Sequence, residues 1–188
     1  SDDVDPKCIW ELSRFEWATK LARAWNLTGE EKYLQRLNSL SVDWLNNNPP
    51  NQGVNWYCAQ ECSIRLINLL LCSDMVGQQG SVAKFNTLVE VHCQRIQSTM
   101  GYGRSQNNNH GITEAAALYI GGIWLKENVG NREEYVRFIR VSRSMLLERV
   151  SKLIFADGGF SQYSTNYHRL LMDTLVQVEA WRAKLAIE

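Results

Sequence analysis

Apolar residues recur at intervals of three and four along nearly the whole chain. Near the amino terminus, Trp10, Phe15, Trp17, Leu21 and Trp25 follow this spacing, which predicts an amphipathic helix. The alternation with a period of two that marks a half-buried strand does not occur. The pattern predicts helices over about residues 9–26, 28–44, 56–75, 82–97, 112–127, 132–155 and 164–185. The fold class predicted from the sequence is therefore all-α.

Local residues indicate where these helices begin and end. Thr28 followed by Glu31 has the spacing of a capping box, which predicts the start of the second helix. Clusters of Gly, Pro, Asn and Ser break the helical pattern and predict irregular structure. These segments lie at 46–51, 77–80, 99–109 and 156–159.

Consecutive helices joined by short and medium loops predict antiparallel hairpins packed side by side in a single domain, residues 1–188. The helix over 56–75 is apolar almost all round, so it is expected to lie deep in the core. Such hairpins build a bundle, a solenoid or a closed toroid. Periodicity alone does not distinguish these three architectures.

Charge and composition narrow the classes of partner. The chain has 20 basic and 20 acidic residues, so its formal net charge is zero. Proteins that bind nucleic acid or anionic membranes usually carry a basic surplus, so neither partner is predicted. No stretch of 18 apolar residues is present, so no membrane span is predicted. The three histidines have no Cys or His at ligand spacing, so we expect no metal site and no cofactor within this chain.

One polar segment with candidate chemistry, Asn108-Asn109-His110, precedes the predicted helix 112–127. A single Asn at that position would be an ordinary helix cap. Three consecutive Asn followed by His form a stronger group, because backbone donors and the helix dipole favour an anion at a helix amino terminus. On the residues alone, a cap and a binding site are equally well supported.

A second polar segment contains Gln162, Tyr167 and His168, close to the start of the last predicted helix. These side chains either form a group of donors or belong to an ordinary amphipathic helix start, in which Tyr167 is buried and His168 is solvated. The sequence supports both interpretations.

Two charged pairs have helical spacing, Glu61 with Arg65 and Glu11 with Arg14. An exposed pair of this kind contributes about 0.2–0.5 kcal/mol. On a helix as apolar as 56–75, a buried pair would be unfavourable unless it had a purpose. Arg65 and Arg14 are therefore either structural partners of these carboxylates or ligands for an anion.

Four segments, in order along the chain, resemble those of heparinase II/III-like polysaccharide lyases, over about residues 6–181. Such lyases have an N-terminal α/α toroid followed by an antiparallel β-sandwich, with the active cleft between them. The resemblance implies that this chain is an incomplete toroid from a longer lyase that lacks its β-sandwich partner, where a second histidine and sometimes a metal belong. The matching segments are Trp10 to Phe15, Asn55-Trp56 with Glu61 and Arg65, Asn108-Asn109-His110 with Glu114, and Gln162 to His168.

The reaction that this resemblance implies is β-elimination on a polysaccharide containing uronic acid. Such a reaction needs a group that neutralises the sugar carboxylate, a base for the proton beside it, and an acid for the leaving oxygen. By resemblance, Asn109 bonds the carboxylate, His110 is the base and Tyr167 is the acid; in some related lyases one Tyr performs both transfers, so Tyr167 remains an alternative base. Arg14 and Arg65 are candidates for gripping substrate carboxylates or sulfates. The other substrate-binding candidates are Asn108, Trp56, Glu61, Gln162 and His168.

Two other functions are compatible with the sequence, a toroid glycoside hydrolase and a non-catalytic carbohydrate-binding module. A hydrolase needs two carboxylates that flank a cleft, but Glu114 and Asp157, the acids near the two polar segments, have no evident partner. The resemblance implies a periplasmic or extracellular location, while five cysteines in no framework spacing and no visible signal peptide leave the cytoplasm open. We expect the 188 residues alone to be inactive, because one wall of the cleft is missing.

Overall fold

The computed structural model describes residues 5–77 and 82–185. Their regular structure is helical, apart from one isolated antiparallel bridge between Ile154 and Phe160. The prediction of an all-α protein is confirmed. The helices are α1 (Pro6–Ser13), α2 (Glu16–Thr28), α3 (Glu31–Asn47), α4 (Val54–Tyr57), α5 (Ala59–Met75), α6 (Val82–Ser105), α7 (Asn109–Asn128), α8 (Glu133–Leu153) and α9 (Thr165–Lys184).

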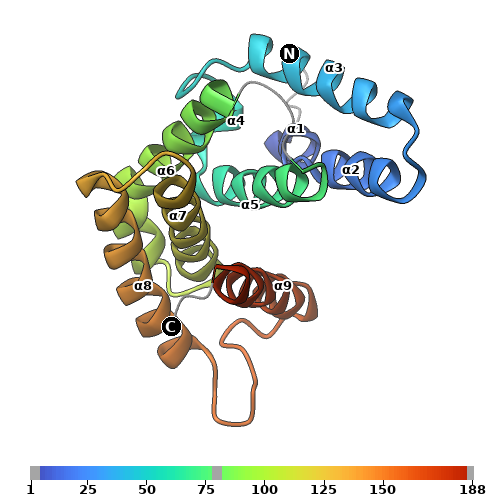
Figure 1. The fold of residues 1–188 in the computed structure, drawn as a ribbon. Coiled ribbons are helices and arrows are strands. Elements are labelled where there is room, and N and C mark those ends of the chain that lie inside the picture. The colour runs from blue at the N-terminus through green and yellow to red at the C-terminus, as the bar shows by residue number, and fades with distance from the viewer. Residues whose placement is uncertain (1–4, 78–81, 186–188) are drawn as a thin grey trace.

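The helices form an open arc (Figure 1). Helix α5 packs between α2 and α7, and α7 packs in turn against α9, so these four make an inner row. Helices α3, α6 and α8 run back along the outside of that row. The arrangement is an incomplete α/α toroid built from antiparallel hairpins, as the resemblance implied.

The inner helices point in the same direction. A hollow of about 320 Å³ lies between the first turns of α2, the start of α7 at Thr113, and the middle of α5 and α9, where Ile67 and Thr174 line it. The carboxyl-terminal ends of α5, α7 and α9 surround another hollow, beside Trp124 and Trp181. We call the first of these the N-terminal hollow. Residues that precede or begin an inner helix therefore lie on one face of the arc.

Helix α7 is the centre of the fold, and every residue from Ile112 to Leu125 is buried. Its sequence is apolar all round because α5, α6, α8 and α9 all pack against it. Two glycines permit this close packing. A Cβ at Gly121 would lie 2.5 Å from the Cys93 sulfur, and one at Gly122 would lie 3.1 Å from Phe138 Cβ.

Two helices predicted as continuous are each broken. The predicted helix 9–26 is interrupted at Phe15, whose backbone is left-handed with φ of 64°. The Phe15 side chain is buried against the rings of Trp17 and Trp44. The predicted helix 56–75 is interrupted at Cys58, which is extended, so a single turn, α4, precedes α5. Helical periodicity continues across both breaks, which is why it did not reveal them.

The predicted capping box at Thr28 is wrong, because Thr28 is the last residue of α2. Its hydroxyl donates to the carbonyl of Ala24 at 2.8 Å and accepts from the backbone N–H of Glu30 at 3.2 Å. The next helix begins at Glu31 without a side-chain cap. The Thr28 side chain therefore ends one helix instead of starting the next.

The prediction that 99–109 is irregular is also wrong over most of its length. Helix α6 continues through Gly101 and Gly103 to Ser105. The absence of a side chain at Gly103 allows the carboxylate of Glu114 to lie against α6. The predicted break at 77–80 includes Gly77, which has φ of 67°, whereas residues 78–80 lie outside the described residues.

Candidate active site

The two polar segments predicted from the sequence meet at the N-terminal end of the inner row. The backbone N–H of Asn109 donates to Oε1 of Gln162 at 2.8 Å. An N–H in the first turn of a helix has no partner within the helix, so a side chain 53 residues away satisfies it here. This hydrogen bond joins the start of α7 to the loop that leads into α9.

The start of α7 is fixed by neighbouring side chains. Asn108 is the N-cap, and its Oδ1 accepts the backbone N–H of His110 at 3.0 Å. The preceding residue, Asn107, has a left-handed backbone, and its Oδ1 accepts Nη1 of Arg149 at 2.9 Å. The cap at Asn108 was one of the two roles that the sequence supported. The Asn109 amide itself forms no side-chain hydrogen bond with the described residues, although Asn109 is only 4% exposed.

His110 lies beside a buried carboxylate. Its Nδ1 is 3.5 Å from Oε1 of Glu114, one turn further along α7. The contact is closer to an ion-pair distance than to a full hydrogen bond. A proton on Nδ1 directed at this carboxylate leaves Nε2 as the free lone pair of the imidazole. The contact pairs Glu114 with an imidazole and not with a second carboxylate.

Glu114 is 1% exposed, and its Oε2 has no hydrogen-bond partner among the described residues. Burial raises the pKa of Glu114, and the neighbouring His110 and Arg95 act in the opposite direction. A buried carboxylate with an unsatisfied oxygen destabilises a fold, so its presence here is a reason to look for a role in function.

The start of α9 carries the second segment. Ser164 is the N-cap, and its hydroxyl lies 3.5 Å from the backbone N–H of Tyr167. Tyr167 is 45% exposed, so its side chain is not buried as one interpretation of the sequence held. His168 is half-buried, with its ring 6.4 Å from that of Phe160.

Arg14 forms a two-pronged ion pair with Glu61. Its Nε and Nη2 donate to the two carboxylate oxygens at 2.7 and 2.9 Å. This pairing replaces both charged pairs predicted from helical spacing, Glu61 with Arg65 and Glu11 with Arg14. The hydrogen bonds to Glu61 raise the pKa of Arg14. Arg14 remains about a quarter exposed, so one face of its guanidinium reaches solvent.

Arg65 is completely buried, although the sequence suggested it as an anion ligand. Its guanidinium stacks between the rings of Trp44 and Trp56, with its Cζ 4.6 and 5.0 Å from their centroids. Its Nε donates to Nε2 of His92 at 2.9 Å, and its Nη2 donates to the carbonyl of Asn55 at 2.9 Å. In this conformation the Arg65 guanidinium has no access to a substrate.

Trp56, a second substrate-binding candidate, is also a core residue. It is 2% exposed, and its indole Nε1 donates to the carbonyl of Asn48 at 3.1 Å. The residue beside it, Tyr57, is 79% exposed. Tyr57, Trp10 and Arg95 help to line a second hollow of about 670 Å³. The exposed ring of Tyr57 is better placed than that of Trp56 to stack on a sugar.

Sequence reasoning did not identify Arg95. Its Nε and Nη2 donate to the carbonyls of Trp56 and Tyr57 at 2.8 and 2.6 Å, so it holds α4 against α6. An arginine in an amphipathic helix usually points to solvent, and nothing in its spacing distinguishes this one. The sequence also did not reveal the role of Gly103, because that role depends on the Glu114 carboxylate that packs against it.

The described residues carry neither a metal-binding cluster nor a membrane span. Within 5–77 and 82–185, no group of three or more His, Cys, Asp or Glu side chains is placed to hold a metal ion. No helix in the described part of the chain has the length and hydropathy needed to cross a membrane. All five cysteines are unpaired thiols, and Cys62, Cys72 and Cys93 are buried.

Comparison with known proteins identifies the family of this chain. Residues 1–186 match the family model described as the Heparinase II/III N-terminus, so the chain belongs to the heparinase II/III family. The resemblance predicted from the four segments is confirmed.

Two relatives are named heparin-sulfate lyases. The chain is 24% identical over 174 residues to a heparin-sulfate lyase of Bacteroides thetaiotaomicron, which covers 84% of this chain and 23% of that protein. It is 23% identical over 194 residues to a heparin-sulfate lyase of Pedobacter heparinus, which covers 98% of this chain and 28% of that protein. The chain thus spans about a quarter of the length of these relatives.

The fold resembles that of a solved structure, the heparan sulfate lyase HepC from Pedobacter heparinus. The TM-score is 0.69 at 20% sequence identity, over 100% of this chain and 30% of that one. At this identity the likeness supports the fold alone.

Proposed function

We propose that this chain supplies the helical wall, and the proton-transfer residues, of a lyase that cleaves a uronic-acid-containing polysaccharide by β-elimination. The observation that carries the proposal is the hydrogen bond between Asn109 and Gln162, which brings two polar helix starts together at one end of the inner row. Family membership and the lyase names of the relatives support the same conclusion.

The first demand of the reaction is stabilisation of negative charge. Removal of the proton beside the sugar carboxylate develops an enolate, whose charge must be met by donors that are already in place. The Asn109 amide fits this demand, because it has no side-chain partner and lies at the amino-terminal end of α7. Arg14, whose guanidinium is held rigid by Glu61, is a second candidate for a substrate anion.

The second demand is transfer of two protons. In the proposed step a base takes the proton from the carbon beside the carboxylate, that electron pair forms the new carbon–carbon double bond, and the glycosidic carbon–oxygen bond breaks. The leaving oxygen then takes a proton from an acid. His110, oriented by Glu114, fits the base, and the accessible Tyr167 fits the acid. Tyr167 performing both transfers remains the alternative assignment.

Substrate chains are expected to run over the starts of α7 and α9, where the candidate base and acid lie. Asn108 caps α7, Gln162 lies in the loop before α9 and His168 lies in the first turn of α9, and all three remain substrate-binding candidates. The hollow beside Tyr57 offers an aromatic surface for a neighbouring sugar, because the flat tyrosine ring can stack on the apolar face of a pyranose. The buried Arg65 and Trp56 pack against each other in the core and hold α4, which carries Tyr57, in place.

Neither alternative function gains support from the geometry. A hydrolase needs two accessible carboxylates on either side of a cleft. Glu114 is buried against His110, and Asp157 lies in an exposed turn where its Oδ1 accepts the N–H of Gly159 at 2.8 Å. A binding module would not require the His110–Glu114 contact.

The arc in Figure 1 is open, and the relatives are several times longer than this chain. We therefore expect the second wall of the cleft, a β-sandwich by family resemblance, to come from outside these 188 residues. The isolated chain should then show no turnover where the full-length protein does.

The deciding experiment incubates the full-length protein with heparan sulfate, hyaluronan, chondroitin and alginate. Elimination creates an unsaturated sugar that absorbs in the ultraviolet, and hydrolysis does not. Rising absorbance that is lost in Tyr167→Phe would support the lyase. New reducing ends without absorbance would replace it with a hydrolase, and binding without either product would leave a carbohydrate-binding module.

A further inference from the structure

A groove runs along the outer face of the arc, between α6 and α8. Its volume is about 540 Å³. Helix α7 packs against both of these helices and against α5 and α9, so it separates the groove from the N-terminal hollow. No candidate site residue lines the groove, and only its Arg104–Glu148 end approaches the start of α7, because Arg149 binds both Glu148 and Asn107. Its lining residues are Gln97, Met100, Gly101, Arg104, Arg137, Arg140, Val141, Ser144, Met145 and Glu148.

Positive charge is concentrated in this groove. Three of its lining residues are arginines, and Glu148 is the one lining carboxylate. Glu148 is already neutralised, because its two oxygens bind Arg104 at 2.9 Å and the buried Arg149 at 2.5 Å. These pairs lower the pKa of Glu148, so it stays ionised and occupied. The chain as a whole has no net charge, so this excess is a local feature.

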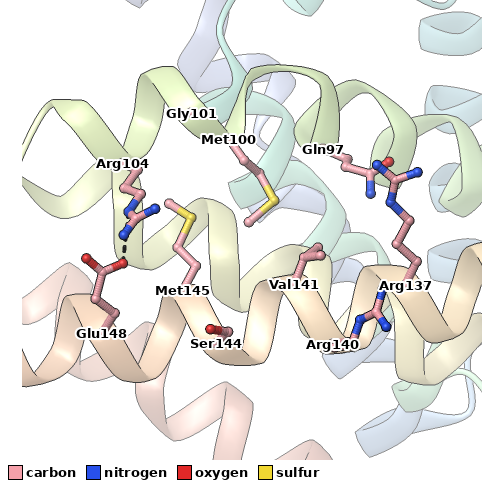
Figure 2. Close-up of a pocket in the computed structure, with 10 residues that line it drawn as sticks. All are labelled: Gln97, Met100, Gly101, Arg104, Arg137, Arg140, Val141, Ser144, Met145 and Glu148. Atoms are coloured by element: carbon pink, nitrogen blue, oxygen red, sulfur yellow. Dashed lines mark ion pairs between the residues drawn. The ribbon is translucent and has the colours of Figure 1, made fainter.

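Arg137 and Arg140 carry the positive charge that no carboxylate in the groove neutralises. Both are exposed, and neither forms an ion pair or hydrogen bond with the described residues. They are three positions apart on α8, which places their Cβ atoms about 5–6 Å apart on one face of the helix. Like charges at this spacing repel, so an anion between them would be favourable. Figure 2 shows Arg137 reaching from α8 toward Gln97 on α6.

The middle of the groove is apolar. Figure 2 shows Met100, Val141 and Met145 between the Arg104–Glu148 pair at one end and Arg137 with Arg140 at the other. Flexible methionine side chains adapt to ligands of irregular shape. From Arg137 to Glu148 the helix rises about 16 Å, at about 1.5 Å per residue. This is long enough for several sugar units, and the combination of an apolar floor with cationic ends suits a ring with anionic substituents.

We propose that the α6–α8 groove is an ancillary site for a sulfated or carboxylated oligosaccharide, bound through Arg137 and Arg140. The preference for an anion follows from these two guanidiniums, which suit sulfate and carboxylate geometry. The identification of that anion as a saccharide rests on the proposed function. A site of this kind would hold a polyanionic chain on the enzyme while another part of the chain occupies the cleft, which raises the effective concentration of substrate.

The test is equilibrium binding of a size-defined heparin hexasaccharide to the full-length protein in a Tyr167→Phe background, so that turnover does not consume the probe. Arg137→Ala with Arg140→Ala should weaken binding about tenfold or more at low salt, the scale expected for losing charge-assisted hydrogen bonds. Both sites are exposed and helical, so alanine there should leave the fold intact.

The matched control is Arg143→Ala. Arg143 is an exposed arginine on the same helix, and it does not line the groove. If binding depends on direct contacts in the groove, loss of Arg143 should weaken it much less than the double variant does, because Arg143 does not line the groove. Equal losses in the control and the double variant would mean diffuse electrostatic attraction and would overturn the site. Unchanged binding in the double variant would overturn it as well.

Two further measurements separate the ligand from the function. Inorganic polyphosphate of matched charge should bind the groove more weakly than the hexasaccharide, and equal binding would reject a saccharide ligand. Ultraviolet assays of the parent with Tyr167 intact test the lyase separately. A protein that binds through Arg137 and Arg140 without eliminating would keep the groove and lose the proposed function.

Discussion

Gly103 in α6 and Glu114 in α7 are in such close contact that a Cβ on Gly103 would lie 2.3 Å from Oε2 of Glu114. The carboxylate that faces His110 is therefore held from behind by the bare backbone of a neighbouring helix. No atom of the described residues hydrogen-bonds that Oε2, so the carboxylate is positioned by packing against Gly103 and by the contact of its Oε1 with His110.

The first prediction compares two glycines in α6. Nothing lies within 4 Å of a Cβ at Gly101, so Gly101→Ala should stabilise the protein by up to about 1 kcal/mol, the usual difference between the two residues in a helix. Gly103→Ala should destabilise it by about 1–3 kcal/mol, because the methyl group displaces the Glu114 carboxylate. Chemical denaturation of both variants measures the difference. Equal stability would show that Glu114 is free to move.

The second prediction concerns Glu114→Gln, which keeps the shape of the side chain and removes its charge. We expect elimination to slow by about tenfold or more, because an amide orients the His110 imidazole less strongly. The pH–rate profile should change as well, which loss of packing alone would not produce. A normal rate with an unchanged profile would remove Glu114 from the orienting role.

The same substitution should raise stability at neutral pH. Burial raises the pKa of Glu114 in the folded protein above its unfolded value, so the folded state binds more protons and loses stability as pH rises through that window. Glutamine carries no such penalty. The melting temperature of Glu114→Gln should therefore exceed that of the parent at pH 8, and the gap should close below about pH 4, where the unfolded carboxyl is also protonated. A gap independent of pH would contradict this account.

The third prediction separates adjacent asparagines. Asn109→Ala should lower turnover by at least about 100-fold with little effect on stability, because its amide has no protein hydrogen bond to lose. Asn108→Ala should lower the free energy of unfolding by about 1 kcal/mol, because it removes the N-cap of α7. Tyr167→Phe should lose turnover to the same extent as Asn109→Ala. Rates close to normal would withdraw those roles.

The fourth prediction is a loss of stability in acid that depends on His92. Burial, and then the charge of Arg65, lower the pKa of His92 to about 3. Because the unfolded value is about 6.5, the unfolded state binds more protons between about pH 6.5 and 3, so stability falls as pH falls through that range. The loss is on the order of 4 kcal/mol at its acid end.

His92→Gln is the matched variant, because its amide oxygen can still accept the hydrogen bond from Nε of Arg65. Unfolding measured from pH 7 to 3 should show a shallower acid slope in this variant than in the parent. Parallel slopes would show that other groups control acid unfolding.

The sequence predicted the class of fold well and the details of the site only in part. Helical spacing in α5, α7 and α8 reflects burial on one side or all round, and such patterns are local. The breaks at Phe15 and Cys58 each involve a single residue whose conformation is imposed by packing, so periodicity passed over them.

Partners of polar side chains were the least predictable feature. Helical spacing paired Glu61 with Arg65, but the break at Phe15 turns Arg14 toward Glu61 instead. Arg65 could then be enclosed by Trp44 and Trp56, which come from other elements. Such choices depend on tertiary contacts between residues that are far apart in the chain. The two polar helix starts were predictable as candidates, because caps and loops leave a local pattern.

The hydrogen bond from Asn109 to Gln162 also ties the integrity of the site to one helix. Helix α9 packs along α7 and pairs Lys184 with Asp74 at the end of α5, and no other helix of the described residues packs extensively against it. An element with one supporting neighbour opens in native-state hydrogen exchange at lower free energy than the centre of a fold. Detachment of α9 would expose the backbone N–H of Asn109 to solvent while α5 and α7 stayed folded. The rate of hydrogen exchange at the backbone N–H of Asn109 would therefore report how often the site is assembled.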